Sequence, residues 1–269
     1  MTIPTIPCVL TIAASDPSGA AGVQADLKTF EARQVYGLSA ITALSVQNSV
    51  SFQGLRVMEA DFVRQQIEAL VSDINIAAIK TGMLLRADII ETVIAAIPPQ
   101  LPAVIDPVFV TGEGKRFVDD PVIEGYRRQL FPRATLITPN LLETAILVGH
   151  PVEDVPAMRE AARQLHQDGA RAVLIKGGHL ATTDHMIDVL YDGRDFYEMD
   201  SPYLPVKNPR GTGCTFASCI AAELAKGADL LTAARTAKAY VAAALEAALD
   251  WHIGHGRGTL FHGVGNKVL

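Results

Sequence analysis

Short, continuously apolar runs alternate along the chain with longer amphipathic stretches. The runs have the length of buried strands, whereas the stretches show the three-to-four-residue spacing of helices. From this pattern we predict strands at residues 8–14, 38–46, 76–80, 103–106, 135–138 and 172–176. Apolar strands separated by helices are typical of a parallel sheet that is covered on both faces.

Helices are predicted between these strands and towards the end of the chain. Pro98 and Pro99 end one of them, Pro156 and Gly169 bound another, and Gly227 is a stop signal. The predicted helices cover residues 22–34, 60–72, 87–97, 122–130, 141–148, 157–167, 216–226 and 230–249.

A hairpin signal interrupts the alternation once. Two strand-like segments, 187–191 and 195–199, flank Asp192-Gly193, a dipeptide that favours a tight turn between antiparallel strands. The chain shows no internal repeat, linker or domain boundary. We therefore predict a single α/β domain over 1–269, with three layers: a mostly parallel sheet, helices on both faces, and a β-hairpin at one edge.

The composition of the 269 residues fits such a domain, with 49% hydrophobic and 19% charged residues. The formal net charge is −6 and no basic face is evident, which argues against nucleic acid as a partner. An acidic chain must bind an anionic ligand locally, with helix N-termini, a few cations or a metal. Since no uncharged apolar stretch reaches about 18 residues, we expect no membrane-spanning helix.

The three cysteines, Cys8, Cys214 and Cys219, fit neither a disulfide framework nor a zinc site. Reduced thiols and a cytoplasmic location are therefore expected. Residues 1–7 contain no basic region and no long apolar run, so no signal peptide is expected.

Polar residues and glycines follow the predicted strands, where ligands bind in open α/β sheets. These clusters are Ser15-Asp16, Gln47-Asn48, Thr81-Gly82, Asp106-Pro107, Asn140 with Glu143, and Lys176-Gly177-Gly178. Each alone is compatible with an ordinary turn, but together they predict a shared site. The chain contains neither the P-loop pattern nor G-x-G-x-x-G after its first strand, which disfavours P-loop proteins and dinucleotide-binding oxidoreductases.

The segment 208–215, Asn-Pro-Arg-Gly-Thr-Gly-Cys-Thr, is the most informative stretch of the sequence. Gly211 and Gly213 permit a tight turn into a helix, whose free N–H groups and positive dipole end favour phosphate. Cys214 lies at the mouth of this turn, where the same field would stabilise a thiolate. The segment predicts phosphate chemistry with a nearby proton acceptor; the alternative is a plain turn with a half-buried cysteine.

Several other polar residues have both a chemical and an ordinary interpretation. Asn140 and Glu143, three residues apart, are placed to hold a hydrated Mg²⁺, although the local sequence favours a capping arrangement instead. Asp106 is a candidate to bind the metal or to assist the reacting hydroxyl, and the alternative is an ordinary turn residue. Lys176 is a candidate to neutralise a phosphate, and the alternative is a solvated lysine at a strand end. The amide of Gln47 suits a heteroaromatic ring, whereas Asp26 is expected on a helix surface. The glycine-rich loop 111–115 is either a lid or a plain connection.

Taken in order, the motifs resemble the hydroxymethylpyrimidine/phosphomethylpyrimidine kinase family of the ribokinase superfamily. The resemblance covers nearly the whole chain, and although each fragment is modest, their order and spacing are specific. The fragments are 10–13 with 15–19, 24–30, 36–37, 41–44, 47–48, 80–83, 106–108, 138–141, 176–179 and 211–215.

The resemblance implies an enzyme that uses ATP and Mg²⁺ to phosphorylate 4-amino-5-hydroxymethyl-2-methylpyrimidine twice, first to the monophosphate and then to the diphosphate, in thiamin biosynthesis. Its implied pyrimidine-binding residues are Gln47, Asp26, Met83 and Val108, with Ala14 at the border of that site. Cys214 is the implied catalytic residue, within the turn of Gly211 and Gly213. The implied ATP and metal residues are Lys176, Thr212, Asn140, Glu143 and Asp106. A homodimer is expected from the same resemblance.

The chain departs from the family pattern at a few positions. Ala14 and Ala20 replace usual glycines, and Pro209-Arg210 replaces a common Thr-His, so that Arg210 is expected either near the phosphates or in solvent. Pyridoxal kinases of the same fold are the main alternative, and Gln47-Asn48 favours the pyrimidine over pyridoxal. A non-catalytic vitamin-binding or nucleotide-binding protein is a second alternative, against which the intact turn, Cys214, Asn140 and Glu143 argue.

Overall fold

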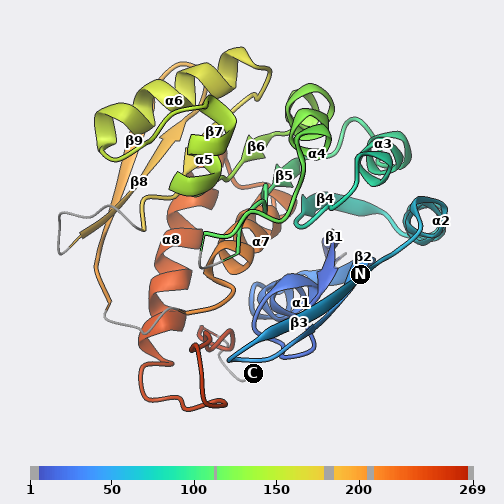
Figure 1. Ribbon diagram of the computed structural model, residues 1–269, viewed down its shortest axis with the longest axis horizontal. Coiled ribbons are helices and arrows are strands. Elements are labelled where there is room, and N and C mark those ends of the chain that lie inside the picture. Colours follow the sequence, from blue (N-terminus) through green and yellow to red (C-terminus); the bar gives the residue numbers. More distant parts are fainter. Residues whose placement is uncertain (1–5, 112–113, 179–184, 205–208, 266–269) are drawn as a thin grey trace, which may run out of the picture.

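The computed structural model describes residues 6–111, 114–178, 185–204 and 209–265 (Figure 1). These residues contain one sheet of nine strands in the order β3-β2-β1-β4-β5-β6-β7-β8-β9. The strands are Cys8–Ser15 (β1), Tyr36–Gln47 (β2), Phe52–Val57 (β3), Ile76–Thr81 (β4), Ala103–Ile105 (β5), Leu136–Ile137 (β6), Val173–Ile175 (β7), His185–Tyr191 (β8) and Phe196–Pro202 (β9).

The six strands from β2 to β7 in this order run parallel, as predicted. Their carboxyl ends therefore meet at one edge of the sheet, and the polar clusters of the sequence follow them there. The hairpin of β8 and β9 is also confirmed: β8 runs antiparallel to both β7 and β9, and Gly193 in the turn has a φ of 93°.

The prediction of a hairpin at one edge alone is incomplete, because β3 pairs antiparallel with β2 at the other edge. The side chains of β3 are exposed or half-buried, so its sequence lacks the apolar run of a buried strand. The β2–β3 turn is closed by Asn48, whose Oδ1 accepts the N–H groups of Val50 and Ser51, both at 2.9 Å.

Helices cover both faces of the sheet and complete the predicted three layers (Figure 1). One core cluster lies on the face of α1, α7 and α8, and a larger one on the face of α2 to α6. The helices are Gly22–Ala32 (α1), Ala60–Val71 (α2), Ala87–Ala96 (α3), Asp120–Gly125 (α4), Leu141–Val148 (α5), Val155–Gln167 (α6), Thr212–Ala225 (α7) and Leu230–Glu246 (α8).

The prediction of one regular helix over 122–130 is wrong in its second half. After α4 the chain continues as a π-helix, Tyr126–Leu130, and a 3₁₀ turn, Phe131–Arg133. Pro132 lacks the N–H that an α-helix would need at this point, and the wider turn accommodates its absence.

Candidate active site

The glycine-rich turn leads directly into α7, as predicted. Gly211 is the N-cap and has a φ of 84°, and a Cβ atom there would lie 1.8 Å from the carbonyl oxygen of Ala20. A side chain is therefore excluded at this position. The first N–H groups of α7, beginning at Thr212, have no acceptor within the helix, and the helix dipole adds positive potential. The turn has the chemistry of an anion site.

Lys176 and Asp106 lie beside this turn, at the ends of β7 and β5. A Cβ atom on Gly213 would be 3.1 Å from Lys176 Nζ and 3.7 Å from Asp106 Oδ2. Lys176 is not a solvated strand end, since it donates to Asp106 Oδ1 at 2.7 Å, and Thr138 donates to the same oxygen at 3.1 Å. Burial lowers the pKa of Lys176, but the nearby Asp106 and Glu143 carboxylates outweigh this and raise it.

Asn140 and Glu143 form the capping box that the local sequence favours. Asn140 Oδ1 accepts the Glu143 N–H at 2.9 Å, and Glu143 Oε2 accepts the Asn140 N–H at 2.8 Å. Glu143 Oε1 also accepts the Phe109 N–H at 3.4 Å. Burial raises the pKa of Glu143 to about 7, Asp106 adds to the rise, and Lys176 opposes it.

A magnesium ion at the mouth of the turn would need water or phosphate ligands in addition to protein carboxylates. Within the described ranges no three His, Cys, Asp or Glu side chains come together to hold a metal. Both Glu143 oxygens already accept backbone N–H groups, whereas Asp106 Oδ2 accepts none from the described residues and faces Gly213. Mg²⁺ typically uses one or two carboxylates and completes its shell with water and phosphates, which this arrangement permits.

Cys214 is half-buried in the first turn of α7, where the sequence led us to expect a stabilised thiolate. That expectation is wrong, because burial raises the pKa of the thiol to about 11. Lys80 and the Gly22 N–H lower the pKa, but they do not compensate for the lost hydration.

Beneath Cys214 lies a closed ion pair between Asp26 and Lys80. Lys80 Nζ donates to both Asp26 oxygens, at 2.9 and 2.8 Å, and neither side chain is exposed. Thr11 donates to Asp26 Oδ2 at 2.6 Å, and Ser218, one helical turn after Cys214, donates to Oδ1 at 2.7 Å. The prediction that Asp26 is a surface residue is therefore wrong, and its assigned contact with the pyrimidine stays a prediction.

We predicted no role for Lys80 from the sequence, in which it lies at the end of an apolar strand. Burial alone would lower its pKa, but the charges of Asp26, Cys214 and Asp106 raise it. Lys80 is therefore a buried cation at the centre of the site. Its signal in the sequence was a lysine inside a strand that is otherwise apolar.

The remaining predicted pyrimidine residues occupy neighbouring strand ends. Gln47 ends β2, Met83 follows β4, and Val108 follows β5, and all three side chains are half-buried. The Gln47 amide has no hydrogen-bond partner among the described residues, which leaves it available for a ligand. The structure brings these residues to the same sheet edge as the anion turn, and their contact with a pyrimidine stays a prediction.

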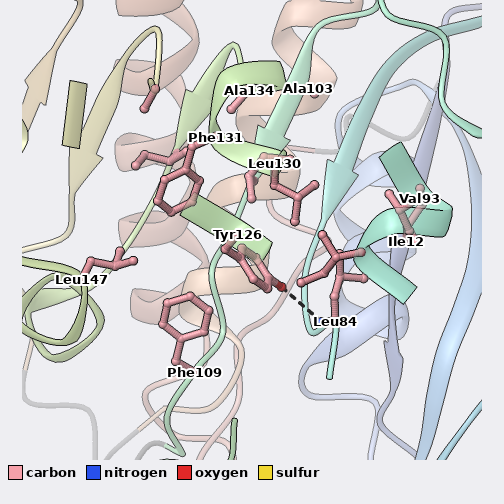
Figure 2. Packing of buried hydrophobic residues seen from close by; sticks show 14 of the residues in the cluster. Ile12, Leu84, Val93, Ala103, Phe109, Tyr126, Leu130, Phe131, Ala134 and Leu147 are labelled. Carbon is pink, nitrogen blue, oxygen red and sulfur yellow. Dashed lines mark hydrogen bonds between the residues drawn. The ribbon is translucent and has the colours of Figure 1, made fainter. Parts of the chain in front are cut away.

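Tyr126, from the π-helix, supports the substrate side and was also missed. Its hydroxyl donates to the Gly82 carbonyl at 2.8 Å. The same hydroxyl accepts the Leu84 N–H at 3.2 Å (Figure 2). Its ring meets Phe109 edge to face, with the centroids 4.9 Å apart. The loop after β4 and the loop after β5 are both fixed by this one side chain.

Two replacements of usual glycines are absorbed by the fold. Ala14 is buried at a bulge between β1 and β2, and its carbonyl oxygen lies where a side chain on Gly22 would be. Ala20 is buried beneath Gly211. The structure therefore shows both alanines fitting the first loop, with the close approaches made by their backbone oxygens.

The expectation that Arg210 points to solvent is wrong, and its position near the phosphates stays a prediction. Its side chain is 10% exposed, and its guanidinium contacts Asp16, Ser18 and the Asn48 carbonyl. Residues 112 and 113 of the predicted lid lie outside the described residues, as does Asn208.

The fold and the shared strand-end site define a ribokinase-like kinase. A model of the phosphomethylpyrimidine kinase family matches residues 16–260, and the chain belongs to this family. It is 42% identical to the hydroxymethylpyrimidine/phosphomethylpyrimidine kinase of Streptomyces coelicolor, covering 98% of each chain.

Other relatives extend the comparison. The chain is 42% identical over 97% of its length to a chloroplastic thiamine biosynthetic bifunctional enzyme of Arabidopsis thaliana, of which it spans about half, 51%. An ADP complex of Bacillus subtilis pyridoxal kinase superposes with a TM-score of 0.87 at 38% identity, covering 96% of this chain and 98% of the other. Among the described residues no helix is long and apolar enough to cross a membrane.

Proposed function

We propose that this protein transfers the γ-phosphoryl group of ATP to 4-amino-5-hydroxymethyl-2-methylpyrimidine, and a second one to the resulting monophosphate, in thiamin biosynthesis. The observation that carries the proposal is the anion turn of α7, with Lys176 and Asp106 beside it and Gln47 at the same sheet edge. The family match and the Streptomyces coelicolor kinase support this substrate class.

The nucleotide half of the site supplies charge neutralisation, on which phosphoryl transfer chiefly depends. In this proposal the N–H groups of 211–214 cradle the transferred phosphoryl group and Lys176 contacts a phosphate. Bound Mg²⁺ would neutralise phosphate charge, and Asp106, Asn140 and Glu143 are the residues that would hold it or its water ligands.

Cys214 is the proposed proton acceptor for the attacking hydroxyl. Because burial raises its pKa to about 11, the thiol is protonated at neutral pH and the thiolate is the minor form. Lys80 lowers that pKa, so it increases the fraction of the accepting form. On the substrate side, the amide of Gln47 would donate to and accept from the pyrimidine edge.

A substrate panel tests this function against its two alternatives. The purified protein is incubated with ATP, Mg²⁺ and either the hydroxymethylpyrimidine, its monophosphate or pyridoxal, and the products are identified by mass. We expect both pyrimidine products. Pyridoxal phosphate as the main product would instead favour the pyridoxal kinase alternative. The similarity to the Bacillus subtilis pyridoxal kinase is the reason for testing it. Binding without any product would favour a non-catalytic protein.

Cys214→Ala tests the catalytic assignment within the same assay. Loss of a general base typically lowers the rate about 10²–10⁴-fold, while the small change at a half-buried position should preserve the fold. Cys219→Ala is the matched control, since Cys219 lies on the same helix but in the core. Near wild-type turnover by Cys214→Ala would show that the thiol has only a structural role.

A homodimer is part of the proposal. Apolar side chains on β2 and β3 are exposed, among them Tyr36, Val46 and Phe52, each more than half exposed at 57–59%. Contact with a second copy would remove such apolar side chains from water. Light scattering after size exclusion measures the mass directly, and a monomer at micromolar concentration would refute the dimer.

A further inference from the structure

Arg210 connects three separate parts of the chain through one guanidinium group. Nη1 donates to Ser18 Oγ at 2.9 Å and to the Asn48 carbonyl at 2.8 Å, and Nη2 donates to Asp16 Oδ2 at 3.0 Å. The Arg210 side chain is 10% exposed and that of Asp16 is 2% exposed. The contact is therefore a nearly buried charge pair, in which loss of one partner has a large effect.

The first partner, Asp16, organises the loop between β1 and α1. Its oxygens also accept the backbone N–H groups of Ser18 and Ala21, both at 2.9 Å. The same loop places the Ala20 carbonyl where a side chain on Gly211 would be. The position of the anion turn thus depends on a loop that Asp16 holds together.

The other partner, the Asn48 carbonyl, follows directly after Gln47. Asn48 also closes the β2–β3 turn with its side chain. Through Arg210, the turn that would carry the phosphoryl group is therefore tied to the strand end that carries the proposed pyrimidine-reading amide. The backbone adds a further link, since the Arg210 N–H donates to the Gly258 carbonyl at 2.9 Å.

We propose that Arg210 is a positioning residue that fixes the anion turn of α7 relative to the substrate-binding strand end at Gln47. The inference rests on the proposed function. Displacement of reacting groups by about 1 Å can lower a rate about 100-fold, so a rigid connection between the two halves matters for turnover. Arginine suits this role because its planar guanidinium donates in several fixed directions, whereas a lysine ammonium does not.

The arrangement distinguishes Arg210 from a phosphate ligand. Its guanidinium is directed at Asp16, Ser18 and Asn48, while the cation beside Gly213 is Lys176. Removing Arg210 should therefore affect alignment of the two substrates more than capture of ATP.

Steady-state kinetics of Arg210→Met, Arg210→Lys, Asp16→Asn and the double variant Asp16→Asn/Arg210→Met test this role. We expect Arg210→Met to lower kcat about 10–100-fold with an unchanged KM for ATP. Arg210→Lys should recover part of kcat, and the double variant should be no slower than the worse single one, because both changes remove the same contact. Arg33→Met, which removes a half-buried ion pair with Glu223 away from the turn, is the control and should keep wild-type kcat.

Hydrogen exchange of the same variants gives a readout that does not need turnover. Peptides covering 16–21 and 211–215 should both exchange faster in Arg210→Met than in Arg33→Met. The inference is overturned if the KM for ATP rises while kcat is unchanged, which would make Arg210 a nucleotide ligand. It is equally overturned if kcat and exchange at 20 °C are unchanged while only the melting temperature falls. Failure of the proposed function would instead appear in the substrate panel with the wild-type protein. In that case hydrogen exchange would still test the positioning role of Arg210.

Discussion

The site contains two buried lysine–aspartate pairs that differ in how completely they are enclosed. Lys80 and Asp26 are both fully buried, and Thr11 and Ser218 complete the carboxylate's shell. The N···O distance is similar in the two pairs, 2.7 Å between Lys176 and Asp106 and 2.8 Å between Lys80 and Asp26. However, the Lys176 side chain is 16% exposed, and Asp106 Oδ2 faces the anion turn.

The difference separates two functions that similar residues can have. Separating an enclosed pair would leave an unpaired charge in the low-dielectric interior. The Lys80–Asp26 pair therefore holds the structure and supplies a constant field to Cys214. A pair at the edge can exchange one carboxylate contact for a phosphate when a ligand enters. The family resemblance assigns Asp26 to the substrate and Lys176 to ATP, and both roles stay predictions.

The largest expected effect comes from breaking the enclosed pair with Lys80→Met. Asp26 would then be a buried carboxylate without its cation, which costs about 3–5 kcal/mol of unfolding free energy. Urea denaturation measures this as a lower midpoint. Lys80→Met/Asp26→Asn, which removes both charges, should regain most of the loss. If the double variant is no more stable than the single one, the pair is not what holds this region.

The pH dependence of the unfolding free energy should show the protonation of Glu143, which lies close to the Lys176–Asp106 pair. Its folded pKa, about 7, lies above the ordinary value of 4.5, so the folded state binds the proton more tightly. Its contribution is therefore full below about pH 4.5 and is lost as the pH rises through 7. Relative to Glu143→Gln, wild-type unfolding free energy should fall by about 2–3 kcal/mol between pH 4.5 and 8. A constant difference in urea titrations across this range would contradict the assignment.

The smallest effect on stability is expected for Lys176→Met, at about 1–3 kcal/mol, because Asp106 keeps its hydrogen bond from Thr138 and the Lys176 side chain is partly exposed. Its effect on catalysis should be clearer: loss of one charged contact to phosphate raises the ATP concentration for half-maximal activity about 10–100-fold. Both quantities are measured on one preparation. A stability loss equal to that of Lys80→Met would remove the distinction between the two pairs.

Local patterns were sufficient for much of the fold. The apolar runs predicted the parallel strands, Asp192-Gly193 predicted the β8–β9 hairpin, and the glycine turn predicted the start of α7. These features depend on side chains and turn residues that are close in the sequence. The strand β3 and the π-helix at Tyr126 were missed because an exposed edge strand has no apolar run and a helical pattern does not reveal an extra residue per turn.

The sequence by itself determined which strand ends would carry the site, because parallel strands bring their carboxyl ends to one edge. It also determined the capping box of Asn140 and Glu143, whose partners are three residues apart. Only the tertiary structure decided the partners of the buried charges. Arg210 meets Asp16 across 194 residues and Lys80 meets Asp26 across 54. Burial sets the pKa values and the pairing of such groups, and burial depends on how the whole chain packs.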